Sequence, residues 1–254
     1  MDSAKPILIY QMGKVGSRSV VQALESATDR PIFHIHQLVP DTLDLVARQS
    51  ERAGDPVPPH IEAGRRVREE LIDTERPVDV VTMVREPIAR NISAFFQNLS
   101  IFARDPDAPI ASLIASFLAG YPHNQPGKWF QNEIERNLGI DVYAEPFDPE
   151  QGWRVYERGP VRLLLMRCES PDAVKSQAMR GFFGLSDLEL KRVNQSSKKN
   201  YRERYTEFVK AARFQPDFVD RMLGTRLTTH FYTPDEIAGF RRKWLASESN
   251  SVPA

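Results

Sequence analysis

The start of the chain places the strongest limit on its fold, because a short apolar run leads through two glycines into a helical pattern. Residues 6–10 form an apolar run long enough for one buried strand. Gly13 and Gly16 follow, and residues 17–27 carry apolar side chains at helical spacing. A strand, a glycine loop and a helix in this order are typical of the first part of an α/β domain.

Later runs of the same kind extend the predicted sheet. Residues 31–36 and 77–84 are predicted to be buried parallel strands, and two further strands are expected at residues 152–157 and 161–167. Helices are expected around them, over residues 41–50, 60–74, 110–118 and 128–138 and from Pro87 onward. The last third is expected to be nearly all helix, with start signals at Ser170, Ser186 and Thr233.

The length of the chain fits one domain with insertions as well as two, and the lack of a repeat or linker favours one. The chain has 254 residues and no internal repeat or low-complexity linker. We therefore expect residues 1–245 to form a single α/β domain. Residues 246–254 lack apolar periodicity and are expected to be a disordered tail.

The composition disfavours several classes of protein. The 34 Lys and Arg residues balance 34 Asp and Glu residues, whereas nucleic-acid binders normally carry a basic excess. The apolar runs are far shorter than the roughly 20 residues of a transmembrane helix, and the N-terminus has no signal-peptide pattern. The single Cys168 cannot form an intrachain disulfide. We expect a protein of the cytoplasm or of a membrane periphery, with no nucleic-acid partner.

The loop at residues 11–19 (Gln-Met-Gly-Lys-Val-Gly-Ser-Arg-Ser) is expected to bind an anion. It follows a predicted strand and opens a helix, where backbone amides point toward an anion and glycines allow close approach. The candidate ligands are Gly13, Lys14, Val15, Gly16, Ser17, Arg18 and Ser19. The spacing differs from G-x-x-x-x-G-K-[ST], which disfavours an ordinary site for ATP and Mg²⁺. The alternative is that the two glycines only form a tight turn.

A second candidate anion site follows the third predicted strand. Arg85 leaves the end of that strand, and Ser93 lies eight residues further on, about two helical turns away. The two side chains could hold one anion together.

The two segments together resemble the sulfotransferase family that uses PAPS (3′-phosphoadenosine-5′-phosphosulfate). The resemblance implies an α/β fold with a P-loop-like parallel sheet flanked by helices, with helical insertions and a helical C-terminal third. It also implies that the first loop with Lys14 holds the 5′-phosphosulfate, that Arg85 and Ser93 hold the 3′-phosphate, and that 3′,5′-ADP is the product. No metal is implied. In this family a late polar loop closes over the nucleotide, which suggests Asn194, Ser196 and Lys198 as further contacts; a solvated loop is the alternative.

Three later segments are similar to a bacterial sulfotransferase-like group usually associated with capsular or surface polysaccharide synthesis. They are residues 129–133, 139–147 and 230–237. The similarity implies a carbohydrate or another small molecule with a hydroxyl group as the acceptor. A nucleotide-binding component of polysaccharide assembly without catalysis is an alternative, and an ATP-dependent kinase is less favoured.

Transfer to a hydroxyl requires a group that accepts the acceptor's proton, and a histidine suits this task. His34 and His36 are two residues apart and should point to one face of the second strand, with His36 nearer its carboxyl end. We therefore expect His36 to be the base, while structural roles for both histidines stay open. Glu133 is the alternative base. Lys14 would stabilise charge on the bridging oxygen of the donor.

Two other groups of residues have structural interpretations. Trp129 and Phe130 are more readily core residues than a platform for a sugar. Arg65, Arg66 and Arg68 are expected to face solvent along one helix. The histidines form no ligand cluster with Cys168, so a zinc site is not expected.

Overall fold

The computed structural model describes residues 4–103, 105–191 and 202–246. The chain divides into two compact units, of which the first comprises Met1–Val84 and Lys128–Val193 and the second Arg85–Gly127 and Asn194–Ala254. A single domain over residues 1–245 stays a prediction. Of the expected tail, only Ala246 lies within the described residues. No helix in the described ranges is long and apolar enough to cross a membrane.

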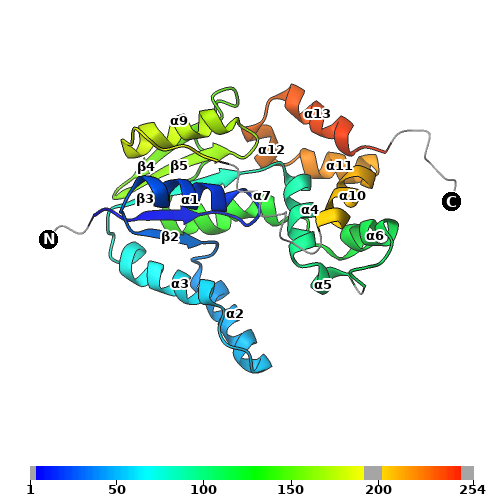
Figure 1. The fold of residues 1–254 in the computed structure, drawn as a ribbon, viewed down its shortest axis with the longest axis horizontal. Helices are drawn as coiled ribbons and strands as arrows, with labels where there is room; N and C mark the ends of the chain where they lie inside the picture. The colour runs from blue at the N-terminus through cyan, green and yellow to red at the C-terminus, as the bar shows by residue number, and fades with distance from the viewer. Residues whose placement is uncertain (1–3, 104, 192–201, 247–254) are drawn as a thin grey trace. The chain divides into compact units, whose positions relative to one another are not determined.

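The first unit contains the α/β sheet that the sequence predicts (Figure 1). Its strands are β1 (Ile7–Tyr10), β2 (Ile32–Ile35), β3 (Val78–Val84), β4 (Trp153–Arg158) and β5 (Val161–Arg167). They form one sheet in the order β2-β1-β3-β5-β4. The pairs β2-β1, β1-β3 and β3-β5 are parallel, and β4 is antiparallel to β5. All five predicted strands are confirmed, with ends that differ by at most one residue.

Of the two strands predicted to be buried, β2 and β3, only β3 is buried along its whole length. β3 lies in the centre of the sheet and is buried at every position. β2 lies at the edge, where Ile32, Phe33 and His34 are only half-buried and Ile35 is buried. The prediction of a buried strand is therefore wrong for most of β2, because an edge strand has a neighbour on one side only.

Helices of the first unit pack against this sheet. α1 (Ser17–Ala27) contacts β1 and β2, α3 (Pro59–Val67) contacts β2 and α2 (Pro40–Ala53), and α9 (Asp172–Phe183) contacts β4 and β5. Two segments are π-helices: η1 (Arg68–Ile72) continues α3, and η2 (Phe130–Glu135) lies between α7 (Gln125–Trp129) and α8 (Arg136–Leu138). The sequence predicts helix in both places but contains no signal for the wider turn.

The second unit is helical, which confirms the expectation for the C-terminal part. Its helices are α4 (Pro87–Gln97), α5 (Leu99–Phe102), α6 (Ile110–Gly120), α10 (Arg202–Ala211), α11 (Pro216–Leu223), α12 (Arg226–Phe231) and α13 (Pro234–Trp244). They enclose an apolar core in which Phe95, Phe117 and Phe208 are fully buried and contact one another edge-on or tilted. Thr233 begins α13 with the predicted capping box.

The prediction of a helix that begins at Ser186 is wrong, since the described residues after Ser186, 187–191, are not helical. Side chains of α9 bond the backbone of this segment instead. Ser176 Oγ accepts a hydrogen bond from the Leu190 amide at 2.9 Å, and Arg180 donates to the Leu188 carbonyl at 3.2 Å. Both leucines are buried, so the segment is fixed by packing against α9 without forming a helix.

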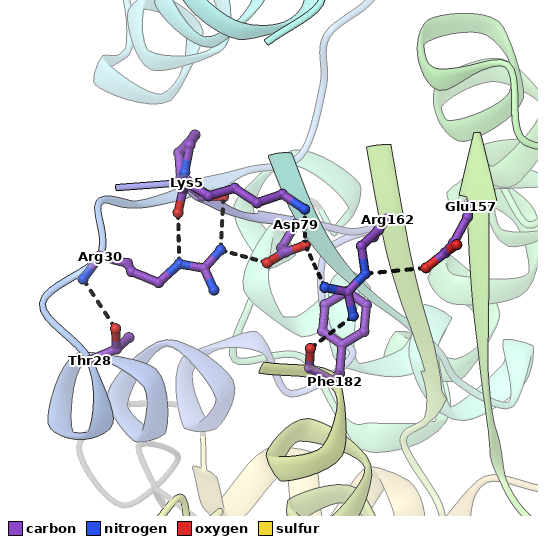
Figure 2. A network of polar contacts seen from close by, with 8 residues as sticks. Lys5, Thr28, Arg30, Asp79, Glu157, Arg162 and Phe182 are labelled. Carbon is purple, nitrogen blue, oxygen red and sulfur yellow. Dashed lines mark hydrogen bonds and ion pairs between the residues drawn. The ribbon is translucent and has the colours of Figure 1, made fainter. Parts of the chain in front are cut away.

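A buried carboxylate joins the amino ends of the parallel strands, as Figure 2 shows. Asp79 in β3 has a side chain only 3% exposed, and it pairs with Lys5 and Arg30 at 2.6 Å each. Arg162 in β5 lies 3.6 Å from the same carboxylate and donates to the Phe182 carbonyl at 3.0 Å. Arg30 also donates to the Lys5 carbonyl at 2.7 Å. Asp79 therefore connects β3 and β5 with the segments that enter β1 and β2.

Asp79→Ala is expected to destabilise the first unit. Removing one partner of a buried ion pair costs about 3–5 kcal/mol, and we expect the lower end because the three cations are 21–39% exposed. Arg66→Ala is the control, because its pair with Glu70 is exposed and should contribute only about 0.3–0.5 kcal/mol. Urea unfolding at neutral pH measures both. A loss below about 1 kcal/mol for Asp79→Ala would contradict the role of this carboxylate.

Candidate functional site

The glycine loop connects the carboxyl end of β1 with the start of α1. Two of its residues, Lys14 (φ 75°) and Gly16 (φ 90°), have left-handed backbone conformations. For a lysine this conformation costs roughly 1–2 kcal/mol. Gly16 is the N-cap residue of α1, and as a glycine it has no side chain that could cap the helix. A strained non-glycine residue at such a helix start is typical of functional loops.

Apolar side chains hold this loop against the first unit. Met12 and Val15 are buried, with exposed fractions of 1% and 0%. Lys14, Ser17 and Ser19 are half-buried, whereas Gly16 and Arg18 are exposed. Because the Val15 side chain is in the core, this residue could contact a ligand only through its backbone.

The two candidate histidines lie on the α1 side of the sheet. The strand register places His34 beside Ile9, and the Gln11 amide donates to the Ile35 carbonyl at 3.3 Å. Because side chains alternate along a strand, Gln11, His34 and His36 share one face. The rings of the two histidines lie 4.9 Å apart, which confirms the common face that their spacing predicts.

His36 follows the last residue of β2 and is half-buried. Its Nδ1 lies 2.8 Å from the Gln11 carbonyl oxygen. Since a carbonyl oxygen only accepts hydrogen bonds, the neutral ring carries its proton on Nδ1 and its lone pair on Nε2. Nε2 is therefore the atom that could take a proton from a substrate.

His34 lies deeper along β2 and has a different character. Burial, followed by the nearby charges of His36 and Arg18, lowers the pKa of His34 to about 4. Among the described residues, its buried Nε2 has no hydrogen-bond partner, and neither do the two amide atoms of the fully buried Gln11. The sequence gives no sign that Gln11 is buried beside the histidines, so Gln11 is not among the predicted site residues.

Glu133 is on the other side of the sheet from the histidines. Its Oε2 accepts hydrogen bonds from Tyr10 Oη and from the Leu38 amide, the latter at 2.9 Å. Tyr10 precedes Gln11 in the chain, so its side chain points to the opposite face. Burial raises the pKa of Glu133. Burial and the neighbouring Glu133 carboxylate raise the pKa of Tyr10. The two candidate bases are therefore not brought together.

The residues around Glu133 are core residues. Trp129 and Phe130 are 9% and 1% exposed, which confirms the core interpretation. The expectation that Arg68 faces solvent is wrong, because its side chain is half-buried and two protein acceptors lie within its reach. Arg68 donates to the Leu38 carbonyl at 3.2 Å and to Asn137 Oδ1 at 2.8 Å.

Arg85 and Ser93 belong to the second unit. Arg85 is the residue after β3, Ser93 lies within α4, and both are half-buried. The Glu86 carboxylate caps α4 by accepting hydrogen bonds from the amides of Ile88 and Ala89 at 2.7 and 2.8 Å. An anion held by Arg85 and Ser93 would therefore be bound by side chains and not by this helix start.

Other expected site residues fall outside what the structure describes. Asn194, Ser196 and Lys198, the expected contacts over the nucleotide, lie outside the described residues. Within the described ranges, no group of three or more His, Cys, Asp or Glu side chains is placed to hold a metal ion. Cys168 is half-buried, and its Sγ lies 3.9 Å from the position that a Cβ on Gly16 would take.

Residues 116–233 match the model of the NKWYS family, described as "Putative capsular polysaccharide synthesis protein". The match includes Trp129, Glu133 and His230, from the segments that resemble the bacterial polysaccharide group. It does not include the glycine loop or Arg85. No curated protein and no solved structure matches the chain. The similarity therefore concerns capsular polysaccharide synthesis and not a particular reaction.

The two loop glycines should respond differently to substitution. Gly16→Ala is expected to lower the free energy of unfolding by about 1–2 kcal/mol, because alanine is strained at φ 90°. The control is Gly13→Ala, since Gly13 has no left-handed backbone and its new Cβ would meet no atom within 4 Å. Urea unfolding measures both variants. Equal losses would contradict the loop conformation.

The lowered pKa of His34 predicts a loss of stability in acid. The unfolded chain takes up this proton near pH 6.5, whereas the folded protein takes it up only near pH 4. The stabilisation is therefore complete above pH 6.5 and is lost as the pH falls toward 4. His34→Leu should reduce the difference between urea midpoints measured at about pH 7 and pH 4.5. His60→Leu, at an exposed histidine of the same unit, controls for the loss of one imidazole; an equal reduction there would contradict the assignment.

Proposed function

We propose that the protein is a sulfotransferase that moves the sulfuryl group of PAPS to a hydroxyl of a carbohydrate. The observation that supports this most is the loop after β1, where Lys14 and Gly16 adopt left-handed conformations directly before the start of α1. Such a loop suits a phosphate or sulfate ester. The similarity of residues 116–233 to a capsular polysaccharide family supports the choice of a carbohydrate acceptor.

The proposed reaction is a direct in-line transfer. The acceptor oxygen forms a bond to sulfur while the bond from sulfur to the bridging oxygen breaks, and 3′,5′-ADP leaves. His36 accepts the acceptor's proton on Nε2, the ring nitrogen opposite the Nδ1 that faces the Gln11 carbonyl. Lys14 stabilises the negative charge that develops on the bridging oxygen.

The 3′-phosphate distinguishes PAPS from ordinary nucleotides. The resemblance to sulfotransferases assigns it to Arg85 and Ser93, and it assigns Asn194, Ser196 and Lys198 to contacts over the nucleotide. These assignments are part of the proposal. A nucleotide-binding component without catalysis would bind 3′,5′-ADP in the same way but would transfer no sulfuryl group.

The nucleotide preference tests the donor. We expect 3′,5′-ADP to raise the melting temperature far more than 5′-AMP or ATP at equal concentration, because only 3′,5′-ADP carries the 3′-phosphate of the donor. A ligand at a hundredfold excess over its Kd stabilises the folded state by about 2.7 kcal/mol. Arg85→Ala should remove most of the preference for 3′,5′-ADP.

Lys14→Ala should lower kcat more than it weakens 3′,5′-ADP binding, because its contribution is largest in the transition state.

The control is Arg66→Ala, an exposed arginine of α3 that is not assigned to the site. Equal thermal shifts for all three nucleotides would contradict PAPS as the donor. Strong binding of 3′,5′-ADP without sulfuryl transfer to any carbohydrate would instead favour the non-catalytic component.

A further inference from the structure

The segment that carries His36 is held by side chains from two separate helical segments, one at α7 and η2 and the other at η1. Trp129 Nε1 donates to the His36 carbonyl at 3.3 Å. Two residues later, the Leu38 amide donates to Glu133 Oε2 at 2.9 Å. Arg68 donates to the carbonyl of the same Leu38 at 3.2 Å. Three hydrogen bonds from three different side chains therefore fix the backbone of residues 36–38.

The polar groups of this clamp also bond one another. Tyr10 Oη donates to Glu133 Oε2, and Asn137 Nδ2 lies 3.2 Å from Tyr10 Oη. Asn137 also donates to the Glu133 carbonyl at 2.8 Å and accepts from Arg68 at 2.8 Å. Glu133 is 6% exposed. A buried network with these partners satisfied holds its members in one arrangement.

Both π-helices of the described residues contribute to the clamp. Arg68 is the first residue of η1, and Glu133 lies within η2. π-helical turns are rare and occur often at functional sites, because the wider turn re-orients side chains at a cost in backbone stability. Two such turns that bond the two backbone polar groups of the same residue, Leu38, indicate that the position of this residue matters.

We propose that Glu133 and Arg68 are positioning residues that act through the backbone amide and carbonyl of Leu38 on the orientation of His36. This inference rests on the proposed function for its catalytic meaning. Glu133 is then not the general base, because its Oε2 already accepts two hydrogen bonds and its partner Tyr10 is on the face opposite the histidines. The clamp holds the His36 backbone, while the Gln11 carbonyl holds the ring through Nδ1.

Two substitutions of Glu133 separate a positioning residue from a base. Glu133→Gln keeps an oxygen that accepts from Leu38 and Tyr10, so kcat should stay within about threefold of the wild type, whereas loss of a general base typically costs 10²- to 10⁴-fold. Glu133→Ala removes the acceptor and should lower kcat by about 10- to 100-fold, because small displacements of a catalytic group have effects of this size. Loss of transfer in Glu133→Gln with an unchanged His36 would overturn the proposal.

A readout on His36 itself does not depend on activity. Long-range ¹H–¹⁵N NMR of the imidazole should show the Nδ1–H form in the wild type and in Glu133→Gln, and a mixture of tautomers in Glu133→Ala. If Glu133→Ala does not fold, Arg68→Met removes the bond to the Leu38 carbonyl and should have the same effect. The NMR result stands even if no sulfuryl transfer is found, so failure of the proposed function is distinguishable from failure of the clamp.

The matched control is Asp79→Ala. Asp79 is also a buried carboxylate of the first unit, but it lies at the amino ends of the strands, away from residues 36–38. The Asp79→Ala substitution should lower the free energy of unfolding and leave the His36 tautomer unchanged. An equal change of tautomer in Asp79→Ala, or none in both Glu133→Ala and Arg68→Met, would overturn the proposal.

Discussion

The ion pairs of Asp79 are the interaction on which the arrangement of the sheet depends. One carboxylate binds cations that belong to β5 and to the segments entering β1 and β2, so four strands are connected at their amino ends. Parallel strands have no tight turns to align them, because each connection must return from the carboxyl end of one strand to the amino end of the next. A charge shared among four strands supplies that alignment.

The two ends of the sheet use buried polar groups differently. At the amino ends, Asp79 faces formal charges on Lys5, Arg30 and Arg162. At the carboxyl ends, Glu133 is bound mainly by neutral donors, Tyr10 Oη and the Leu38 amide, and burial raises its pKa. An ion pair favours the charged carboxylate, whereas burial among neutral donors weakens that preference. The first arrangement joins strands, and the second orients a short backbone segment.

The sequence predicted the elements of the fold better than the environment of the site. Apolar runs such as residues 77–84 identify strands because burial imposes their composition, and the glycine loop can be identified because its candidate ligands are consecutive. The left-handed conformation of Lys14 has no such signal. Neither has the pairing of Tyr10 with Glu133, which are 123 residues apart. The same holds for Arg68, whose acceptors on Leu38 and Asn137 come from distant parts of the chain.

The edges of the sheet determine how copies of the chain behave when they meet. β2, the edge strand of four residues, offers only a short row of backbone groups to another strand. β4, at the other edge, carries charged side chains at Arg154, Glu157 and Arg158. Short and charged edge strands are the usual means by which proteins prevent edge-to-edge pairing. The open sheet is thereby protected against growth into aggregates at both of its edges.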